Sequence, residues 1–228
     1  MIQNLDSFDG GRVWARYVVQ YTYSGGNPTM TLYDYAVAGG TCSNNLTPHY
    51  AGPNGLLFPS VTEYGIPTFI SETQISSFYT PALTSNNAVY AIWIGTNDLG
   101  NGEFLTNQQN AGVTLQDFVN CVFNAFDSLY ENGGRYFVLL NIAPLHLAPQ
   151  YASVANHGVL ADHYWPDKPS DLDAIAQTMY NQVTTVNNDY WAQLPGMVGS
   201  RYPGASFAIF NVFQLVSRPF DRSLPAGD

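Results

Sequence analysis

Ile92-Trp93-Ile94-Gly95-Thr96-Asn97-Asp98-Leu99-Gly100 is an apolar run that ends abruptly in small and polar residues. We interpret Ala88–Ile94 as a buried strand, because short runs rich in β-branched and aromatic residues suit a sheet covered on both faces. Asn97 and Asp98 then lie in the loop at the carboxyl end of this strand. Ligands bind at that end in open α/β sheets, so the pair is a candidate site. A plain turn is the equally weighted alternative, since Gly, Asn and Asp are common turn residues.

The composition is that of a folded, acidic chain. It has 228 residues, of which 46% are apolar, and this predicts a single domain over residues 1–228 with a sizeable core. Lys and Arg number 7 against 17 Asp and Glu, which gives a formal net charge of -10. Such a charge opposes binding to a phosphate backbone, so we expect no nucleic-acid partner. No apolar run approaches the roughly 20 residues that span a bilayer, so we expect no membrane partner.

The cysteines and the N-terminal residues form no motif that assigns a cofactor or a location. Cys42 and Cys121 form neither a metal-ligand pattern nor a disulfide framework, and we interpret each as a small buried apolar residue. We therefore expect no metal and no other cofactor. Residues 1–6 contain neither a basic nor an apolar segment, so no signal peptide is visible. Asn45-Leu46-Thr47 is the only glycosylation sequon, and it matters only in a secreted protein.

Predicted helices and strands alternate along the chain. Apolar stripes at helical spacing predict helices, and runs of β-branched and aromatic residues predict strands. The helices are expected at 11–22, 68–79, 114–129 and 171–194, and the strands at 31–37, 88–94, 136–142 and 206–212. The residues of 42–67 and 145–169 show no period, and we expect both segments to be irregular. Alternation of this kind implies an α/β fold with a parallel sheet and helices on both faces.

Two of the predicted strands are followed by residues that suit an oxyanion hole. Gly39 follows the strand at 31–37, and Asn97 follows the strand at 88–94. A backbone N–H that can be approached closely and a side-chain amide can both donate to an oxygen that acquires charge during acyl transfer. Loss of one such donor typically costs about 3 to 4 kcal/mol of transition-state stabilisation. We therefore predict that Gly39 and Asn97 act together.

At these positions the sequence resembles the SGNH, or GDSL-type, hydrolases. Tyr35–Thr41 is similar to the family's second block, whose glycine donates to the oxyanion, and Gly95–Asp98 is similar to its third block, Gly-x-Asn-Asp. The resemblance implies that Gly39 and Asn97 are those two donors. It extends to the secreted carbohydrate esterases of family sixteen, which deacetylate sugars. That similarity is carried by Gly11-Arg12-Val13-Trp14, Asn141-Ile142-Ala143-Pro144-Leu145 and Tyr164-Trp165-Pro166-Asp167-Lys168.

The resemblance implies a fold, an activity and a location. The fold is the three-layer, flavodoxin-like parallel sheet of the SGNH hydrolases, and the activity is hydrolysis of carbohydrate esters by a serine-type esterase. The substrate is a small-molecule or oligosaccharide ester, and the location is extracellular. Among substrate contacts we predict Asp98, beside the third-block asparagine, and Trp165, a loop tryptophan that could stack on a sugar.

The catalytic serine and histidine of the family have no clear counterpart. Ser7 follows an Asp, as the family's nucleophile does, but it lacks the preceding glycine and apolar strand. We interpret it as an ordinary N-terminal serine and keep it as the alternative nucleophile. No Asp in the chain has a His three residues later, where the family places its base. The four histidines are interpreted as loop residues: His49, His146, His157 and His163.

These departures lead us to expect a hydrolase domain that lacks its first strand and its C-terminal segment, and that is inactive as given. The strands at 31–37 and 88–94 would then border the place of the missing strand. Two alternatives stay open. One is a non-catalytic domain that keeps the fold and binds carbohydrate or a protein, and the other is a fragment that does not fold stably.

Overall fold

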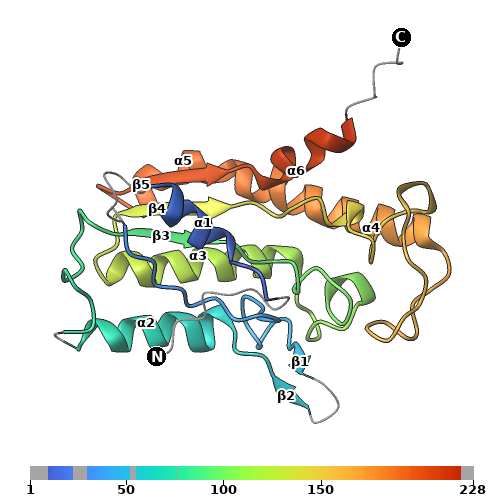
Figure 1. Ribbon diagram of the computed structural model, residues 1–228, viewed down its shortest axis with the longest axis horizontal. Coiled ribbons are helices and arrows are strands. Elements are labelled where there is room, and N and C mark those ends of the chain that lie inside the picture. The colour runs from blue at the N-terminus through green and yellow to red at the C-terminus, as the bar shows by residue number, and fades with distance from the viewer. Residues whose placement is uncertain (1–9, 23–29, 52–54, 76, 222–228) are drawn as a thin grey trace.

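The computed structural model describes residues 10–22, 30–51, 55–75 and 77–221 (Figure 1). Its helices are α1 (Trp14–Tyr21), α2 (Ile66–Thr73), α3 (Leu115–Glu131), α4 (Leu172–Thr184), α5 (Leu194–Arg201) and α6 (Val212–Asp221). Its strands are β1 (Tyr50–Ala51), β2 (Leu56–Leu57), β3 (Val89–Ile92), β4 (Tyr136–Leu140) and β5 (Ser206–Phe210). The predicted α/β class is confirmed. A single domain over residues 1–228 stays a prediction.

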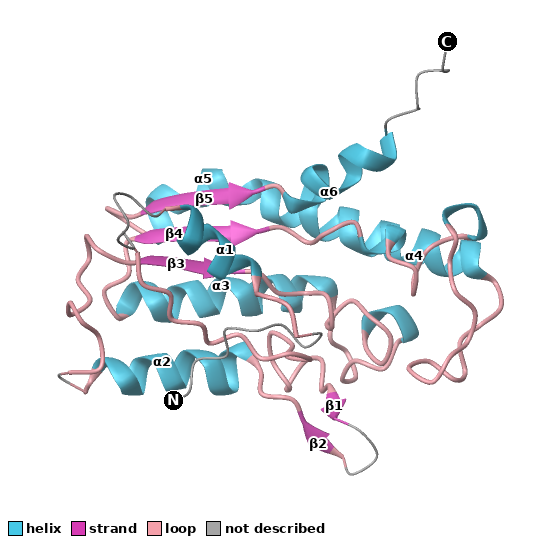
Figure 2. Ribbon diagram, in the orientation of Figure 1, coloured by secondary structure: helices cyan, strands magenta, loops and turns pink. Residues whose placement is uncertain are grey.

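The main sheet contains three parallel strands in the order β3-β4-β5. Val89 pairs with Tyr136, and Tyr136 pairs with Ser206, so the three strands begin at the same level. Their carboxyl ends therefore lie at one edge of the sheet, as the arrows in Figure 2 show. The loop that leaves β3 contains Asn97 and Asp98, and the segment that leaves β4 contains Trp165; both begin at this edge.

Helix α3 begins where the sequence predicts it. The Thr114 hydroxyl accepts a hydrogen bond from the Asp117 N–H, and the Asp117 carboxylate accepts one from the Thr114 N–H. This capping box satisfies two N–H groups that the first helical turn cannot satisfy itself. Helix α4 begins in a similar way, because the Asp171 side chain accepts a hydrogen bond from the Ala174 N–H at 3.0 Å.

The core lies between the sheet and the helices that pack against one of its faces. Phe137 of β4 contacts Phe126 of α3, with ring centroids 5.7 Å apart, and Phe118 of α3 contacts Trp191 at 6.1 Å. The opposite face of the sheet is less covered. Val89, Trp93, Tyr136 and Phe210 are each at least 40% exposed there, although Trp14 of α1 packs edge-on against Trp93.

The predicted strand at 31–37 is wrong, because this segment is extended but pairs with no strand. Its aromatic side chains pack toward α2 instead. The Tyr35 hydroxyl donates to Glu72 and is hydrogen-bonded to the Tyr79 hydroxyl, and the Tyr35 ring lies edge-on to Phe69. β-Branched and aromatic residues favour a strand only where a partner strand is available. Among the described residues, no strand lies on the free edge of β3.

The two cysteines are buried, as their interpretation expects, and they also form a disulfide that their spacing does not indicate. Cys42 and Cys121 are 0% and 5% exposed, and their Cα atoms lie 6.3 Å apart. The bond joins the segment after Gly39 to the middle of α3, across 79 positions of sequence. It thereby fixes this segment beside the loop that follows β3.

Other boundaries also differ from the predictions: α2 ends at Thr73, although the sequence predicts a helix to residue 79. The segment 42–67 contains the short β1–β2 hairpin, which lies apart from the main sheet (Figure 2). The helix predicted at 171–194 is interrupted after Thr184 by a π-helical segment, Thr185–Tyr190. No helix is predicted after the strand at 206–212, whereas the structure has α6 there.

Candidate active site

Gly39 occupies a tight turn that only glycine fits. The Gly40 N–H donates to the Val37 carbonyl at 3.0 Å, and Gly39 has a φ of +80°. These features define a type II turn, whose third residue requires a positive φ. A Cβ atom at position 39 would also lie 2.7 Å from the ring of Phe58. The Gly39 N–H itself has no hydrogen-bond partner among the described residues, as an oxyanion donor requires.

Asn97 lies in a compact loop directly after β3. Gly95, with a φ of +122°, begins the loop, and a Cβ atom there would lie 3.0 Å from both Ile142 and Phe118. The Leu99 N–H donates to the Gly95 carbonyl at 2.9 Å, which closes the loop into one helical turn. The glycine thus lets the chain turn above the core and place Asn97 at the sheet edge.

The structure brings Asn97 and the Gly39 turn together. Asn97 Nδ2 donates to the Gly40 carbonyl oxygen at 2.8 Å. An amide nitrogen carries two hydrogens, so one hydrogen holds the turn and the second is available for a ligand. The backbone N–H of Gly39 is one residue away from that contact. This pairing of two predicted donors can stabilise a developing negative charge on an oxygen.

Asp98 accepts hydrogen bonds from the segment that follows Gly39. Its Oδ1 accepts hydrogen bonds from the Cys42 N–H at 2.9 Å and from the Thr47 hydroxyl at 2.7 Å. The residue is 0% exposed. Burial, opposed by these two hydrogen bonds, raises the pKa of Asp98 to about 6. Its geometry favours a positioning role, and its predicted contact with substrate stays a prediction.

Glu103 is a second buried carboxyl group in the same loop. It is 1% exposed, and burial together with the charge of Asp98 raises its pKa to about 8. Asp98 Oδ2 and Glu103 Oε2 are both buried without a hydrogen-bond partner among the described residues. Two ionised carboxylates in such surroundings repel each other, so the pair favours a state that holds at least one proton. Glu103 is therefore a buried group and not a solvated surface carboxylate.

His49 lies at the site although sequence reasoning assigned it no role. Its Nδ1 donates to the Gly39 carbonyl oxygen at 2.6 Å, and its ring packs against Phe58 with centroids 5.1 Å apart. The Gly39 and Gly40 carbonyls are therefore held by His49 and Asn97 respectively. The signal that could have found His49 is its place in a long irregular segment directly after a candidate oxyanion glycine.

Trp165 belongs to a buried cluster near the same loop. It is 3% exposed, lies edge-on to Tyr151 at 6.2 Å, and has Lys168 Nζ 5.5 Å from its ring centroid. The Tyr151 hydroxyl accepts a hydrogen bond from the Asn101 N–H, at 3.5 Å, in the Asn97 loop. Trp165 thus supports that loop in this structure, and its predicted stacking on a sugar stays a prediction.

The three other histidines are not brought to the Gly39–Asn97 pair. Ser7, the alternative nucleophile, lies outside the described residues. His146 packs between Tyr180 and Phe213, and burial lowers its pKa. His157 and His163 are exposed, in keeping with their interpretation as loop residues.

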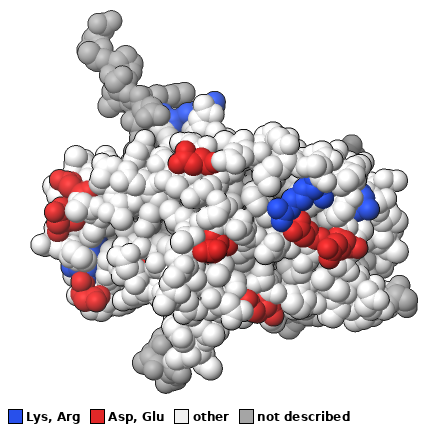
Figure 3. Space-filling view, turned by 180° about the vertical axis from the view of Figure 1, so that it is seen from behind, with Lys and Arg blue, Asp and Glu red and all other residues white. Residues whose placement is uncertain are grey.

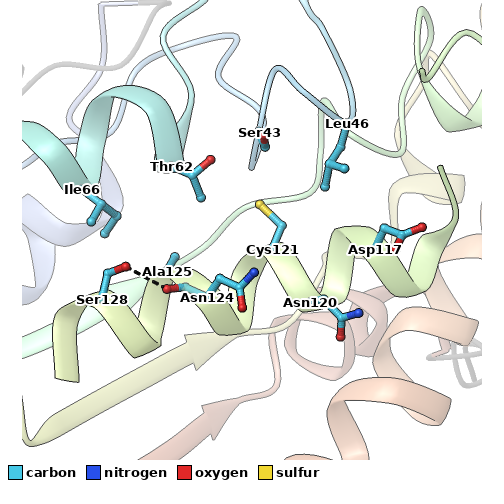
Figure 4. A pocket seen from close by; sticks show the side chains of 10 residues that line it. All are labelled: Ser43, Leu46, Thr62, Ile66, Asp117, Asn120, Cys121, Asn124, Ala125 and Ser128. Carbon is cyan, nitrogen blue, oxygen red and sulfur yellow. Dashed lines mark hydrogen bonds between the residues drawn. The ribbon is translucent and has the colours of Figure 1, made fainter. Parts of the chain in front are cut away.

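A pocket of about 440 Å³ lies beside the site but does not include it (Figure 4). Asn120, Asn124 and Ser128 of α3 line one wall, and Leu46 and Thr62 line the wall opposite. Neither Gly39 nor Asn97 contributes to it, so the pocket and the predicted donor pair are separate features.

Charge and metal-binding groups are sparse. Figure 3 shows one face on which a few acidic and basic side chains, some of them adjacent, lie on a largely uncharged surface. Within residues 10–22, 30–51, 55–75 and 77–221, no three His, Cys, Asp or Glu side chains are grouped as a metal site requires. Over the same ranges, each helix is too short or too polar to cross a bilayer.

Comparison with known proteins gives three informative relatives. The chain is 33% identical over 210 residues to an acetylesterase of Hypocrea jecorina. The aligned residues make up 91% of this chain and 58% of the relative. It is 26% identical to an acetylesterase of Thermothelomyces thermophilus, over 84% of this chain and 56% of that one. A GDSL esterase/lipase of Zea mays is 27% identical over 56% of this chain and 30% of its own length. No family model matches the sequence. The chain therefore spans a little over half the length of the two acetylesterases.

Proposed function

The chain is homologous to fungal acetylesterases and belongs to the SGNH, or GDSL-type, hydrolase family, and we propose that its function is the deacetylation of carbohydrate esters. The observation that supports this most strongly is the 2.8 Å hydrogen bond between Asn97 Nδ2 and the Gly40 carbonyl. It joins the two loops from which the proposed oxyanion donors come.

In the proposed reaction, an acetyl carbonyl oxygen lies between the Gly39 N–H and the second hydrogen of Asn97 Nδ2. Attack on the carbonyl carbon turns this oxygen into an anion, and the two donors stabilise the charge as it develops. Their positions are fixed in advance, since His49 holds the Gly39 carbonyl and Asp98 holds the following segment. The proposal assigns no nucleophile or base among the described residues.

We also propose that the three strands are part of a flavodoxin-like sheet and that the protein is extracellular. The parallel order β3-β4-β5 supports the first point. The Cys42–Cys121 disulfide supports the second, because such bonds persist in oxidising compartments and are rare in the cytosol.

The test is an esterase assay on two proteins. One is the chain as given, and the other is the chain extended at both ends with the flanking segments of the Hypocrea jecorina relative. The substrates are an aryl acetate and an acetylated xylo-oligosaccharide. We expect turnover by the extended protein that a serine-reactive phosphonate abolishes. A folded extended protein without serine-dependent turnover would overturn the proposal. Saturable oligosaccharide binding without turnover would instead favour a non-catalytic binding domain.

A further inference from the structure

We propose that Asn45 carries an N-linked glycan. The proposal rests on passage of the chain through the secretory pathway and not on ester hydrolysis. Asn45-Leu46-Thr47 is the only sequon in the sequence, and the structure places its asparagine in an exposed turn. The site lies three residues from Cys42, whose disulfide with Cys121 indicates the oxidising compartment in which such glycans are added.

The turn presents the Asn45 side chain in a defined position. The Asn45 N–H donates to Ser43 Oγ at 3.1 Å, and the Asn45 carbonyl accepts from Asn110 Nδ2 at 2.9 Å. The Leu46 carbonyl accepts a further hydrogen bond from the Asn110 N–H at 2.9 Å. The backbone is thus held from both sides while the side-chain amide remains at the surface.

The contact of the Asn45 side chain is compatible with a glycan. Asn45 Nδ2 donates to Glu63 Oε1 at 3.1 Å. In the transfer, Nδ2 forms a bond to C1 of the first sugar, and the bond from C1 to the diphosphate of a lipid-linked oligosaccharide breaks. One amide proton is lost to a base, and the other stays on Nδ2. The remaining hydrogen can still donate to Glu63, so the folded turn keeps this hydrogen bond.

Thr47 fixes the order of events. It is 0% exposed, and its hydroxyl donates to the buried Asp98. A transferase that recognises the whole sequon needs access to this hydroxyl, which the folded chain hides. The glycan is therefore added before the Thr47 hydroxyl forms its hydrogen bond to Asp98 and before Cys42 is buried. In the folded protein it projects from the turn that bears Leu46, at the rim of the 440 Å³ pocket.

The test is secretion of the full chain from yeast behind a cleavable leader. Electrophoretic mobility is compared before and after treatment with peptide N-glycosidase, which leaves an aspartate at position 45 that peptide mass spectrometry detects. We expect one glycan on the wild-type chain, none on Asn45→Gln, and one on Thr47→Ser, which keeps both the sequon and the hydroxyl.

A secreted chain with the Cys42–Cys121 disulfide formed and with Asn45 unmodified would overturn the proposal. Retention of the mobility shift in Asn45→Gln would overturn it equally, because the glycan would then lie elsewhere. Neither outcome bears on esterase activity, which is assayed separately on the extended protein, so failure of this proposal and failure of the proposed function are distinguishable.

Discussion

Asn97 Nδ2 donates a hydrogen bond of 2.8 Å to the carbonyl oxygen of Gly40, fifty-seven positions earlier in the chain. This contact connects the loop after β3 to the turn at Gly39. Most of the unusual features nearby, including the positive φ of Gly39 and the burial of Asp98, maintain that connection.

Gly39→Ala should lower the free energy of unfolding by more than Gly112→Ala. The two glycines have nearly the same φ, +80° and +81°, so the backbone strain is shared and amounts to about 1 to 2 kcal/mol. Only at position 39 would the new Cβ meet a side chain, the Phe58 ring at 2.7 Å, whereas nothing lies within 4 Å at position 112. Urea unfolding of both variants measures the difference. Equal destabilisation would contradict the tight packing of Phe58 on the turn.

Asp98→Ala should lower the free energy of unfolding by about 2 to 4 kcal/mol, because two buried donors, the Cys42 N–H and the Thr47 hydroxyl, lose their acceptor. Asp98→Asn should cost less, since an amide oxygen can still accept from both. Chemical denaturation of the two variants gives the comparison. A stability unaffected by Asp98→Ala would leave a role in substrate contact as the better account of this residue.

The free energy of unfolding should fall as the pH rises from about 4 to 8. The pKa values of Asp98 and Glu103 are raised in the folded state, from 3.8 to about 6 and from 4.5 to about 8. At these two groups the folded state binds more protons than the unfolded state over this window, so their contribution to stability is greatest at acidic pH. It decreases by about 1.4 kcal/mol per pH unit for each extra proton bound.

Glu103→Gln should flatten this pH dependence above pH 6, because glutamine stays neutral where Glu103 must ionise. Glu131→Gln, at the exposed end of α3, is the matched control and should leave the slope unchanged. Thermal unfolding at several pH values gives the slopes. An identical slope for the wild type and Glu103→Gln would show that Glu103 does not bind the additional proton.

Loss of the disulfide should destabilise the fold without changing its topology. Cys42 and Cys121 close a loop across 79 positions, for which the chain-entropy model gives about 4 to 5 kcal/mol. Urea unfolding with and without a reductant measures this in the wild type, and the double variant Cys42→Ser, Cys121→Ser should be insensitive to reductant. If reductant leaves wild-type stability unchanged, the two sulfurs are not joined in the protein.

Local signals in the sequence predict much of this structure. The Thr114–Asp117 capping box and the apolar stripe after it predict α3 to within two residues of its observed ends. The small and polar residues at Gly39 and Asn97 predict two donors that act together, and Asn97 does contact the turn at Gly39, although no strand precedes that turn. The helix cap and the two short motifs are each local in sequence, so a single sequence contains them.

Features that depend on distant partners are not visible in the sequence. The residues at 31–37 have strand propensity, but the segment pairs with no described strand. Its Tyr35 hydroxyl is hydrogen-bonded to Glu72 and Tyr79 instead. The spacing of Cys42 and Cys121 does not reveal that the chain brings them to a Cα separation of 6.3 Å. His49 and Glu103 likewise acquire their roles only from contacts that the folded chain creates.

The central claim is that Asn97 is an oxyanion donor, and its most direct measurement is the kcat of Asn97→Ala for an aryl acetate in the extended protein described above. Loss of one donor should lower kcat by about 100- to 1,000-fold with little change in KM. Asn120→Ala, in the neighbouring pocket, is the matched control and should retain wild-type kcat, and thermal unfolding should show both variants folded. A folded Asn97→Ala variant whose kcat stays within a few-fold of the wild type would contradict the account.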